Sequence, residues 1–195
     1  RDKGHDVLLM MDSVTRFAMA QREIGLSTGE PPVSRGYPPS VFALLPQLME
    51  RAGNSKKGSI TAFFTVLVDG DDLNDPIADQ SRSILDGHIV LTRDLTEQGF
   101  YPPINILKSA SRVIDKVVTK EHYNDFLKLK RVLSLIKENE VLIRVGAYKK
   151  GMDLELDSAI AKKEKAREFL TQGTLEKYSF DEIVANLRKV LIWYH

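Results

Sequence analysis

Cysteine is absent from this 195-residue sequence, and its absence excludes disulfides, thiolate metal sites and a cysteine nucleophile. The four histidines are His5, His88, His122 and His195, and their spacing does not suit a shared metal site. No apolar run approaches the roughly 20 residues of a membrane-spanning helix, and no signal peptide is visible. These absences predict a soluble globular protein and are consistent with a reducing compartment.

An excess of charge of one sign is absent as well. The 28 Lys and Arg residues balance 27 Asp and Glu residues, which gives a formal net charge of +1. A strong positive excess would indicate nucleic acid or an anionic membrane as the main partner, and this sequence has none. With 43% hydrophobic residues, the chain can bury one core, or one core and a small second domain.

The stretch around which the chain is organised covers residues 6–16. Residues 7–11 are all apolar, which predicts a strand buried on both sides of a parallel sheet. Asp12 follows at the carboxyl end of this strand, the edge at which open α/β sheets bind ligands. An acid in this place is typical of a Walker B element, which helps to hold Mg²⁺ beside nucleotide phosphates. The alternative is that Asp12 caps a helix that begins near Ser13.

Strands and helices alternate after Asp12, and this order predicts an α/β domain. The expected elements are helices at 13–24, 40–52 and 75–85, strands at 59–68, 88–92 and 104–107, and a loop at 25–39. We expect Gly25 to end the first helix, Ser40 to cap the second, and Pro46 to kink or split the second. Residues 53–59 have the glycine spacing of a phosphate loop, but Ser59 stands where that motif needs lysine, so we interpret them as a polar turn. The strand at 59–68 also ends in acids, beginning with Asp69.

Beyond residue 118 the apolar residues follow helical spacing and no strand is predicted. We expect helices from about 119 to 142, 157 to 171 and 179 to 193. The last of these opens with Ser179 and Glu182, which have the spacing of a capping box. The pattern predicts an α/β part at 1–118 and an all-helical domain at 119–195. A buried strand at the very start also leads us to expect that the chain is the C-terminal part of a longer protein.

Six stretches together carry a specific resemblance. They are residues 6–24, 29–32, 36–42, 50–54, 57–61 and 84–91. In these the sequence resembles the flagellum-specific ATPases of the type III protein export apparatus, a family homologous to the catalytic subunits of rotary ATP synthases. The resemblance implies the C-terminal part of a RecA-like parallel-sheet core followed by a small helical domain. It also implies a homohexameric ring in which ATP hydrolysis energises the unfolding and export of flagellar proteins.

The resemblance also implies roles for three residues and the cofactors ATP and Mg²⁺. Asp12 corresponds to the Walker B acid, which holds Mg²⁺ through water. Tyr101 corresponds to the aromatic residue that stacks on adenine, a role that suits an exposed ring face. Arg112 corresponds to an arginine finger that acts in trans on the γ-phosphate bound by the next subunit, where a planar, permanently charged guanidinium stabilises the transition state.

Two motifs of the family are not in this sequence. These are the glycine-rich phosphate loop with its lysine and the glutamate that orients the attacking water. We expect both upstream, and we therefore expect this chain alone to be inactive. The segment at 146–157 replaces the acidic loop of the synthases, which favours the export branch.

The resemblance implies partners as well. These are a coiled-coil stalk in the ring channel, faced by residues 25–36, a regulatory stator-like export protein, export substrates with their chaperones, and the membrane export gate. The implied location is cytoplasmic, at the cytoplasmic face of the membrane export apparatus.

Three alternatives stay open. The first is a catalytic or nucleotide-binding subunit of a related type III secretion or rotary ATPase ring. The second is a nucleic-acid translocase, which would place cationic or aromatic side chains in the channel loop. Residues 25–36 contain Arg35 and Glu30, so the net charge of this segment is nearly neutral, and we expect no nucleic-acid partner. The third is a ring subunit that binds nucleotide without turnover, against which Asp12 and Arg112 argue.

Overall fold

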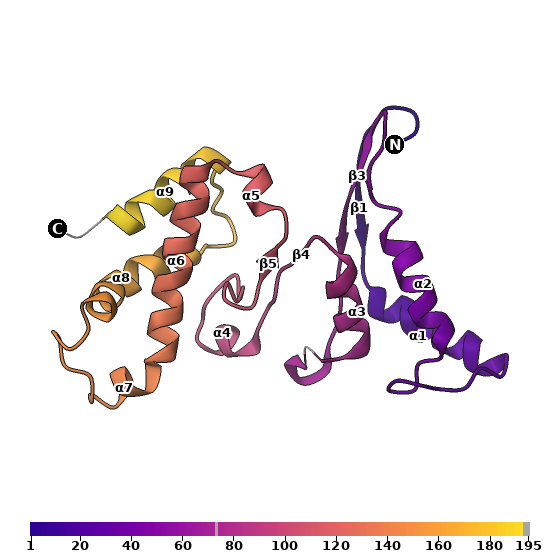
Figure 1. Ribbon diagram of the computed structural model, residues 1–195, viewed down its shortest axis with the longest axis horizontal. Coiled ribbons are helices and arrows are strands. Elements are labelled where there is room, and N and C mark those ends of the chain that lie inside the picture. Colours follow the sequence, from indigo (N-terminus) through magenta and orange to yellow (C-terminus); the bar gives the residue numbers. More distant parts are fainter. Residues whose placement is uncertain (73, 193–195) are drawn as a thin grey trace. The chain divides into compact units, whose positions relative to one another are not determined.

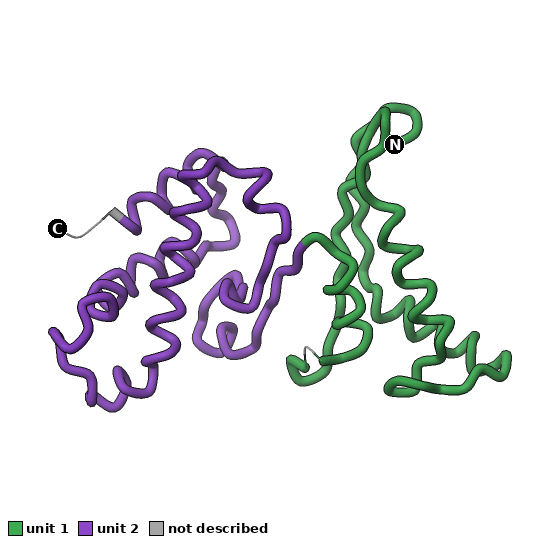
Figure 2. Tube along the Cα trace, in the orientation of Figure 1, with its two compact units in different colours: residues 1–86 green, residues 87–195 purple. Residues whose placement is uncertain are grey.

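The computed structural model describes residues 1–72 and 74–192. The chain divides into two compact units, Arg1–Asp86 and Gly87–His195, which Figure 2 shows in different colours. Figure 1 labels the helices and strands. The first unit contains a small sheet with helices, and the second contains a short two-stranded sheet followed by helices.

The sheet of the first unit has the strand order β1-β3-β2. β1 (Asp6–Met11) and β3 (Ser59–Phe64) run parallel, and each residue of β1 pairs in order with one of β3. A parallel pair needs a long crossover connection, which the helices between these two strands provide. β2 (Gly53–Asn54) joins the other edge of β3 in the antiparallel direction.

The prediction that β1 is buried on both sides is wrong for this chain. Leu8 and Met10 are 61% and 75% exposed, and Phe63 of β3 is 55% exposed. The helical core of the unit reaches only the Met11 and Phe64 end of the two strands. Because side chains alternate between the faces of a strand, Leu8 and Met10 lie on one face, and Val7 and Leu9, 40% and 42% exposed, lie on the other, so β1 presents apolar side chains to the surface on both faces.

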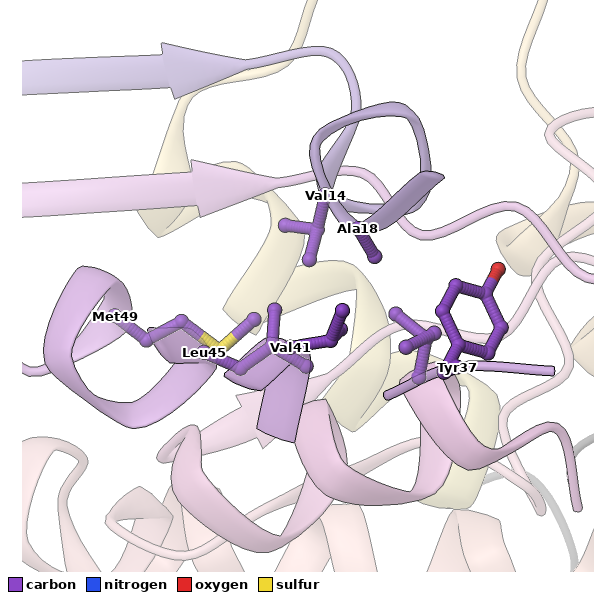
Figure 3. Packing of buried hydrophobic residues seen from close by; sticks show 7 residues of the cluster. Val14, Ala18, Tyr37, Val41, Leu45 and Met49 are labelled. Carbon is purple, nitrogen blue, oxygen red and sulfur yellow. The ribbon is translucent and has the colours of Figure 1, made fainter. Parts of the chain in front are cut away.

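The helices of the first unit are α1 (Val14–Ser27), α2 (Pro39–Met49) and α3 (Pro76–Ile84), with a short 3-10 turn η1 (Asp69–Asp71) before α3. Their apolar sides meet in one core, part of which Figure 3 shows, and it consists of Val14, Ala18, Tyr37, Val41, Leu45, Met49 and Ile77. The predicted helix at 75–85 is confirmed almost to the residue, since the Asp75 side chain caps it and Pro76 opens it.

Two predicted helix boundaries are wrong in this unit. Gly25 does not end α1, which continues to Ser27. A Cβ atom at Gly25 would lie 2.7 Å from the Cγ of Pro38, so the glycine serves a close approach of the chain. Nor does the Ser40 hydroxyl cap α2; the backbone N–H of Ser40 instead donates to the carboxylate of Glu30 at 3.1 Å. A carboxylate is favourable at a helix N-terminus.

The other boundaries differ by a few residues. The helix predicted at 40–52 ends at Met49, and it continues through Pro46 as one helix. The strand predicted at 59–68 ends at Phe64. The polar turn predicted at 53–59 is present as the connection between β2 and β3, where the Ser55 amide donates to the Gly58 carbonyl at 2.8 Å.

The second unit begins with β4 (Gly87–His88), α4 (Arg93–Glu97), β5 (Ala110–Ser111) and α5 (Ile114–Val117). The predicted strands at 88–92 and 104–107 are wrong as strands of a parallel sheet. β4 and β5 pair antiparallel, over two residues each.

A narrow antiparallel stem takes the place of those predicted strands. An isolated bridge joins Leu91 to Ile104, the Thr92 amide donates to the Pro103 carbonyl at 3.0 Å, and the Asn105 amide donates to the Val90 carbonyl at 2.7 Å. The connection between the two segments, residues 93–102 with α4, is shorter than the crossover of about a dozen or more residues that parallel strands need, which is consistent with their antiparallel pairing.

The remaining helices of the second unit are α6 (Lys120–Glu138), α7 (Glu140–Arg144), α8 (Leu154–Leu170) and α9 (Phe180–Ile192). We call these four helices the helical part. Its buried apolar residues form two clusters, Leu129, Ala166, Leu187 and Val190 in one and Val132, Leu135, Leu156 and Ala159 in the other. No helix among the described residues is long and apolar enough to cross a membrane.

The ends of α8 and α9 show which local signals are reliable. The predicted capping box is confirmed: the Ser179 amide donates to the Glu182 carboxylate at 2.7 Å, and the Glu182 amide donates to the Ser179 hydroxyl at 3.3 Å. α8 begins three residues earlier than predicted because the Asp153 carboxylate accepts from the amides that open it. The predicted end of α9 at residue 193 lies outside the described residues.

Candidate functional site

Asp12 lies exposed at the carboxyl end of β1. The parallel pairing continues one residue beyond the strands, where the Thr65 amide donates to the Met11 carbonyl at 3.1 Å. This brings the Thr65 hydroxyl within 2.7 Å of the Asp12 carboxylate, to which it donates. Asp12 is therefore oriented by the end of the neighbouring strand, at the edge where α/β sheets bind ligands.

Asp12 does not serve as a helix cap. Ser13 is the N-cap of α1, and its hydroxyl accepts from the Arg16 amide at 3.3 Å. The first turn of α1 is also tied to the segment after β3, since the Thr15 hydroxyl accepts from the Leu67 amide at 2.8 Å and donates to the Leu67 carbonyl at 3.1 Å. These bonds hold the strand ends and the helix start together around the carboxylate.

The acids that follow β3 have a different use. Asp72 and Asp75 both pair with Arg35, at 2.5 Å and 3.6 Å between guanidinium nitrogen and carboxylate oxygen. The hydrogen bond from Arg35, assisted by the Asn74 amide, lowers the pKa of Asp72 below its usual value. The pairs join the loop before α2 to the loop before α3, so Arg35 of the predicted channel loop is paired to carboxylates of its own unit.

The donor set of the first unit fits one mode of Mg²⁺ binding. Among residues 1–72 and 74–192, no group of three or more His, Asp or Glu side chains is placed to hold a metal ion by itself. Mg²⁺ in nucleotide sites takes one or two carboxylates together with waters and substrate phosphates. The oriented carboxylate of Asp12 suits that role and would not suffice as a metal cage.

Tyr101 lies in the second unit, in the loop after α4, with half of its surface exposed. Gly99 has φ of +69°, a left-handed conformation that favours glycine, and its amide donates to the Thr96 carbonyl at 2.9 Å. The Phe100 amide donates to the Leu95 carbonyl at 2.8 Å. The C-terminus of α4 thus fixes the backbone on one side of Tyr101 and leaves its ring accessible.

The other side of this loop is held by residues that the sequence did not reveal. The Gln172 amide, just after α8, donates to the Tyr101 carbonyl at 2.8 Å. Arg167 of α8 donates to the Gln98 carbonyl at 3.5 Å. A hollow of about 690 Å³ lies beside this contact, lined in part by Pro102, Ile104, Phe169, Leu170 and Tyr178. No local pattern indicates a contact between segments about seventy residues apart.

Arg112 follows β5 directly and is exposed. The strand pair before it is tight, since a Cβ atom at Gly87 would lie 2.9 Å from the Ala110 carbonyl oxygen. The Ser109 hydroxyl accepts from the Val90 amide at 2.9 Å and donates to the Asn105 carbonyl at 2.7 Å. Arg112 therefore projects from a braced stem.

The structure divides the three predicted site residues between the two units. Asp12 is positioned by the first unit, and Tyr101 and Arg112 by the second. Within the second unit, Tyr101 lies in the loop between the paired segments at 90–92 and 103–105, and Arg112 follows the β4–β5 pair at the other end of this stem. The predicted roles of all three residues stay predictions.

Two family models match this chain. Residues 1–111 match the nucleotide-binding domain of the ATP synthase alpha/beta family, and residues 118–189 match the T3SS EscN ATPase C-terminal domain. The first match alone covers more than half of the chain.

Several relatives are similar over almost the whole chain. A flagellum-specific ATP synthase of Helicobacter pylori is 59% identical over 98% of this chain and 44% of its own length, and one of Bacillus subtilis is 55% identical over 96% and 43%. The solved structure of the assembled ATPase EscN from enteropathogenic E. coli superimposes with a TM-score of 0.95, at 51% identity over 98% of this chain and 46% of that one. The chain spans a little less than half the length of these relatives.

The comparisons bear on two of the predictions. The resemblance to the flagellum-specific ATPases is confirmed, and so is the fold class, an α/β nucleotide-binding part followed by helices.

Proposed function

Because the chain belongs to the ATP synthase alpha/beta family, we propose that it is part of the ATP-hydrolysing motor subunit of a flagellar type III protein export apparatus. The observation that carries the proposal is its 59% identity, over 98% of the chain, to a flagellum-specific ATP synthase. In this role ATP hydrolysis energises the unfolding and export of flagellar proteins. The gap between the two matched family regions supports the predicted domain boundary near residue 118.

In the proposed site Asp12 is the Walker B acid. Its exposed carboxylate, oriented by Thr65, would help to hold Mg²⁺ through the water shell of the ion, as the resemblance implies. Bound Mg²⁺ neutralises charge on the nucleotide phosphates. The contribution of this chain is to fix the carboxylate at the sheet edge before nucleotide arrives.

Tyr101 and Arg112 are proposed to act from the second unit. The half-exposed ring of Tyr101 offers a face on which adenine stacks. Arg112, exposed on its braced stem, would reach the γ-phosphate bound by the next subunit of a homohexameric ring. An interface site of this kind makes activity depend on assembly.

The proposed partners follow from the family and from one solved relative. The structure of EscN in complex with its central stalk EscO superimposes on this chain with a TM-score of 0.86 at 50% identity. We extend this to a coiled-coil stalk for the present protein, and further to a stator-like regulator, export substrates with chaperones and the export gate. The ring would work at the cytoplasmic face of the membrane export apparatus.

The test compares two carboxylates of one strand in the full-length protein. Asp6 stands at the opposite end of β1 from Asp12, and its carboxylate accepts from the Ser59 hydroxyl at 2.7 Å, much as Asp12 accepts from Thr65. We expect Asp12→Asn to lower Mg²⁺-dependent ATP turnover by about 100-fold or more, and Asp6→Asn to leave it within about twofold. Equal effects of the two variants would contradict the assignment.

The chain itself offers a second arm of the test. It lacks the backbone amides and the lysine that cradle nucleotide phosphates, so the purified 195-residue chain should hydrolyse no ATP. Sustained Mg²⁺-dependent turnover by this chain would mean that the active site lies elsewhere.

A further inference from the structure

The loop that carries Tyr101 has two anchors in the second unit. One is the C-terminus of α4, through the amides of Gly99 and Phe100. The other is the C-terminus of α8, through the Gln172 amide, which donates to the Tyr101 carbonyl at 2.8 Å, and the Arg167 guanidinium, which donates to the Gln98 carbonyl at 3.5 Å. The second anchor joins the loop to the helical part.

The segment after α8 is itself well braced. The Thr171 hydroxyl donates to the Arg167 carbonyl at 2.8 Å. The Gln172 side chain donates to the Glu176 carbonyl at 2.7 Å, and the Glu176 carboxylate accepts from the Gly173 amide at 2.9 Å. The Thr171 bond and the bond between Gly173 and Glu176 do not involve the Gln172 side chain, and they order the chain on either side of the Gln172 amide.

The Tyr101 ring has no aromatic partner among the described residues, and half of the residue's surface is exposed. The direction of the ring therefore depends in large part on the backbone that carries it. Stacking on a base requires a ring at a defined offset, so a loosened backbone would weaken the stack without touching the reacting phosphates.

We propose that the C-terminal end of α8, through the Gln172 backbone amide and Arg167, positions Tyr101 and so makes nucleotide affinity depend on the helical part. The proposal rests on the proposed function, in which Tyr101 stacks on adenine. Arg167 and Gln172 are positioning residues, since they act on the nucleotide through the Tyr101 loop. A movement of α8 would be transmitted to the base-binding ring through the backbone.

A proline at position 172 tests the amide directly, because proline has no N–H to donate. Thr171 already has φ of −107° and ψ of 136°, the extended conformation that a residue before proline requires, so the preceding residue need not change its conformation. The matched control is Gln172→Ala, which keeps the amide and removes only the side-chain bond to Glu176.

In the full-length enzyme we expect Gln172→Pro to raise the KM for ATP and the Kd for a fluorescent ATP analogue about fivefold, the factor given by one hydrogen bond of ordinary strength. The kcat should stay within about twofold, because the phosphate site is untouched. Gln172→Ala should leave both constants at their wild-type values, because it keeps the amide. A purely structural defect would instead lower the active fraction, and with it kcat, at unchanged KM.

Arg167→Ala gives a second, milder variant that keeps the proposal testable if the proline variant does not fold. We expect about a twofold rise in KM, since its bond is long and exposed, and a return toward the wild-type value in Arg167→Lys, which retains a donor. Both Gln172→Pro and Arg167→Ala should lose their effect in a Tyr101→Ala background, because the ring they position is then absent.

The outcomes separate the two proposals. If Tyr101→Ala weakens nucleotide binding while Gln172→Pro and Arg167→Ala do not, the proposed site stands and the positioning role is wrong. If Gln172→Pro acts equally in the presence and absence of the Tyr101 ring, the positioning role is also wrong. If Tyr101→Ala itself leaves affinity unchanged, the adenine site in the proposed function fails first.

Discussion

The sheet of the first unit and the helical part of the second bury their apolar side chains to different extents. In the sheet, Leu8, Met10 and Phe63 are more than half exposed. In the helical part, α6 packs against α8 and α9 around two buried clusters that include Leu129 and Leu135. An apolar strand face of this kind is typical of an interface with further structure, whereas the helical clusters are buried between helices of the second unit.

The two units also differ in how their site residues would act. Asp12 is braced at a sheet edge by Thr65 and would serve the nucleotide of its own subunit. Arg112 projects from the stem of the second unit and would serve the nucleotide of a neighbour. This difference predicts that an Asp12 variant loses the activity of its own nucleotide site, whereas an Arg112 variant loses the activity of the site in the neighbouring subunit.

The largest expected effect is that of removing Arg112, the proposed arginine finger. Arg112→Ala in the full-length protein should leave nucleotide binding largely intact and lower ATP turnover by about 10³-fold or more. Arg112→Lys should restore little, because an ammonium does not reproduce the planar fork of the guanidinium. Arg131→Ala, which removes an exposed ion pair with Glu155 in the helical part, is the control and should leave turnover within about twofold.

A mixing experiment then tests action in trans. Subunits with Arg112→Ala are combined with subunits whose phosphate-loop lysine is replaced, each nearly inactive alone. In a mixed ring, some interfaces pair an intact phosphate site with an intact arginine, so partial activity should return. If mixed rings form and no mixing ratio recovers hydrolysis, two explanations are left: Arg112 acts within its own subunit, or the ring tolerates no inactive site. Rings that carry a single defective subunit would distinguish the two.

The next expected effect concerns local stability, and it compares a buried leucine of the helical part with an exposed leucine of the sheet. In the 195-residue chain, Leu129→Ala should lower the free energy of opening of α6 amides by about 2–5 kcal/mol, since Leu129 is buried between helices. Leu8→Ala should change the opening of β1 amides by no more than about 0.5 kcal/mol, since the side chain is mostly exposed. Amide hydrogen exchange reports the two regions separately.

The same two variants in the full-length protein sharpen the comparison. If the remainder of the nucleotide-binding domain covers the exposed face of β1, Leu8→Ala should then cost about 2 kcal/mol or more, while the cost of Leu129→Ala should not change. An unchanged, small effect of Leu8→Ala in the longer protein would show that this face stays at the surface.

Local signals predicted much of this fold, and the reasons are visible in particular residues. Asp75 and Pro76 mark the start of α3, and Ser179 and Glu182 mark the start of α9, because capping acts between residues two or three positions apart. The predicted element boundaries that depend on contacts with distant residues were wrong. The glycine at position 25 serves a contact with the chain thirteen residues later rather than a helix end.

The candidate site divides in the same way. The position of Asp12 at a strand end follows from a run of five apolar residues, which is a local pattern. Its bond from Thr65 and the bond from the Gln172 amide to Tyr101 join segments more than fifty residues apart. Such contacts depend on strand register and helix packing, neither of which the spacing of residues in one segment determines.

The smallest effect concerns Tyr101, and it tests whether the second unit contributes binding as well as chemistry. Tyr101→Ala in the full-length enzyme should weaken nucleotide binding by about 1 kcal/mol or somewhat more, roughly fivefold to tenfold in Kd, because a stacking surface is lost. Tyr101→Phe should be mild, since the ring stacks and the hydroxyl does not. Phe180→Ala removes another exposed aromatic ring of the same unit and should not alter the Kd. Titration with a fluorescent ATP analogue measures the Kd of all three variants. Equal affinity of wild type and Tyr101→Ala would contradict the stacking role of Tyr101, and Arg112 would then be the only proposed contribution of the second unit.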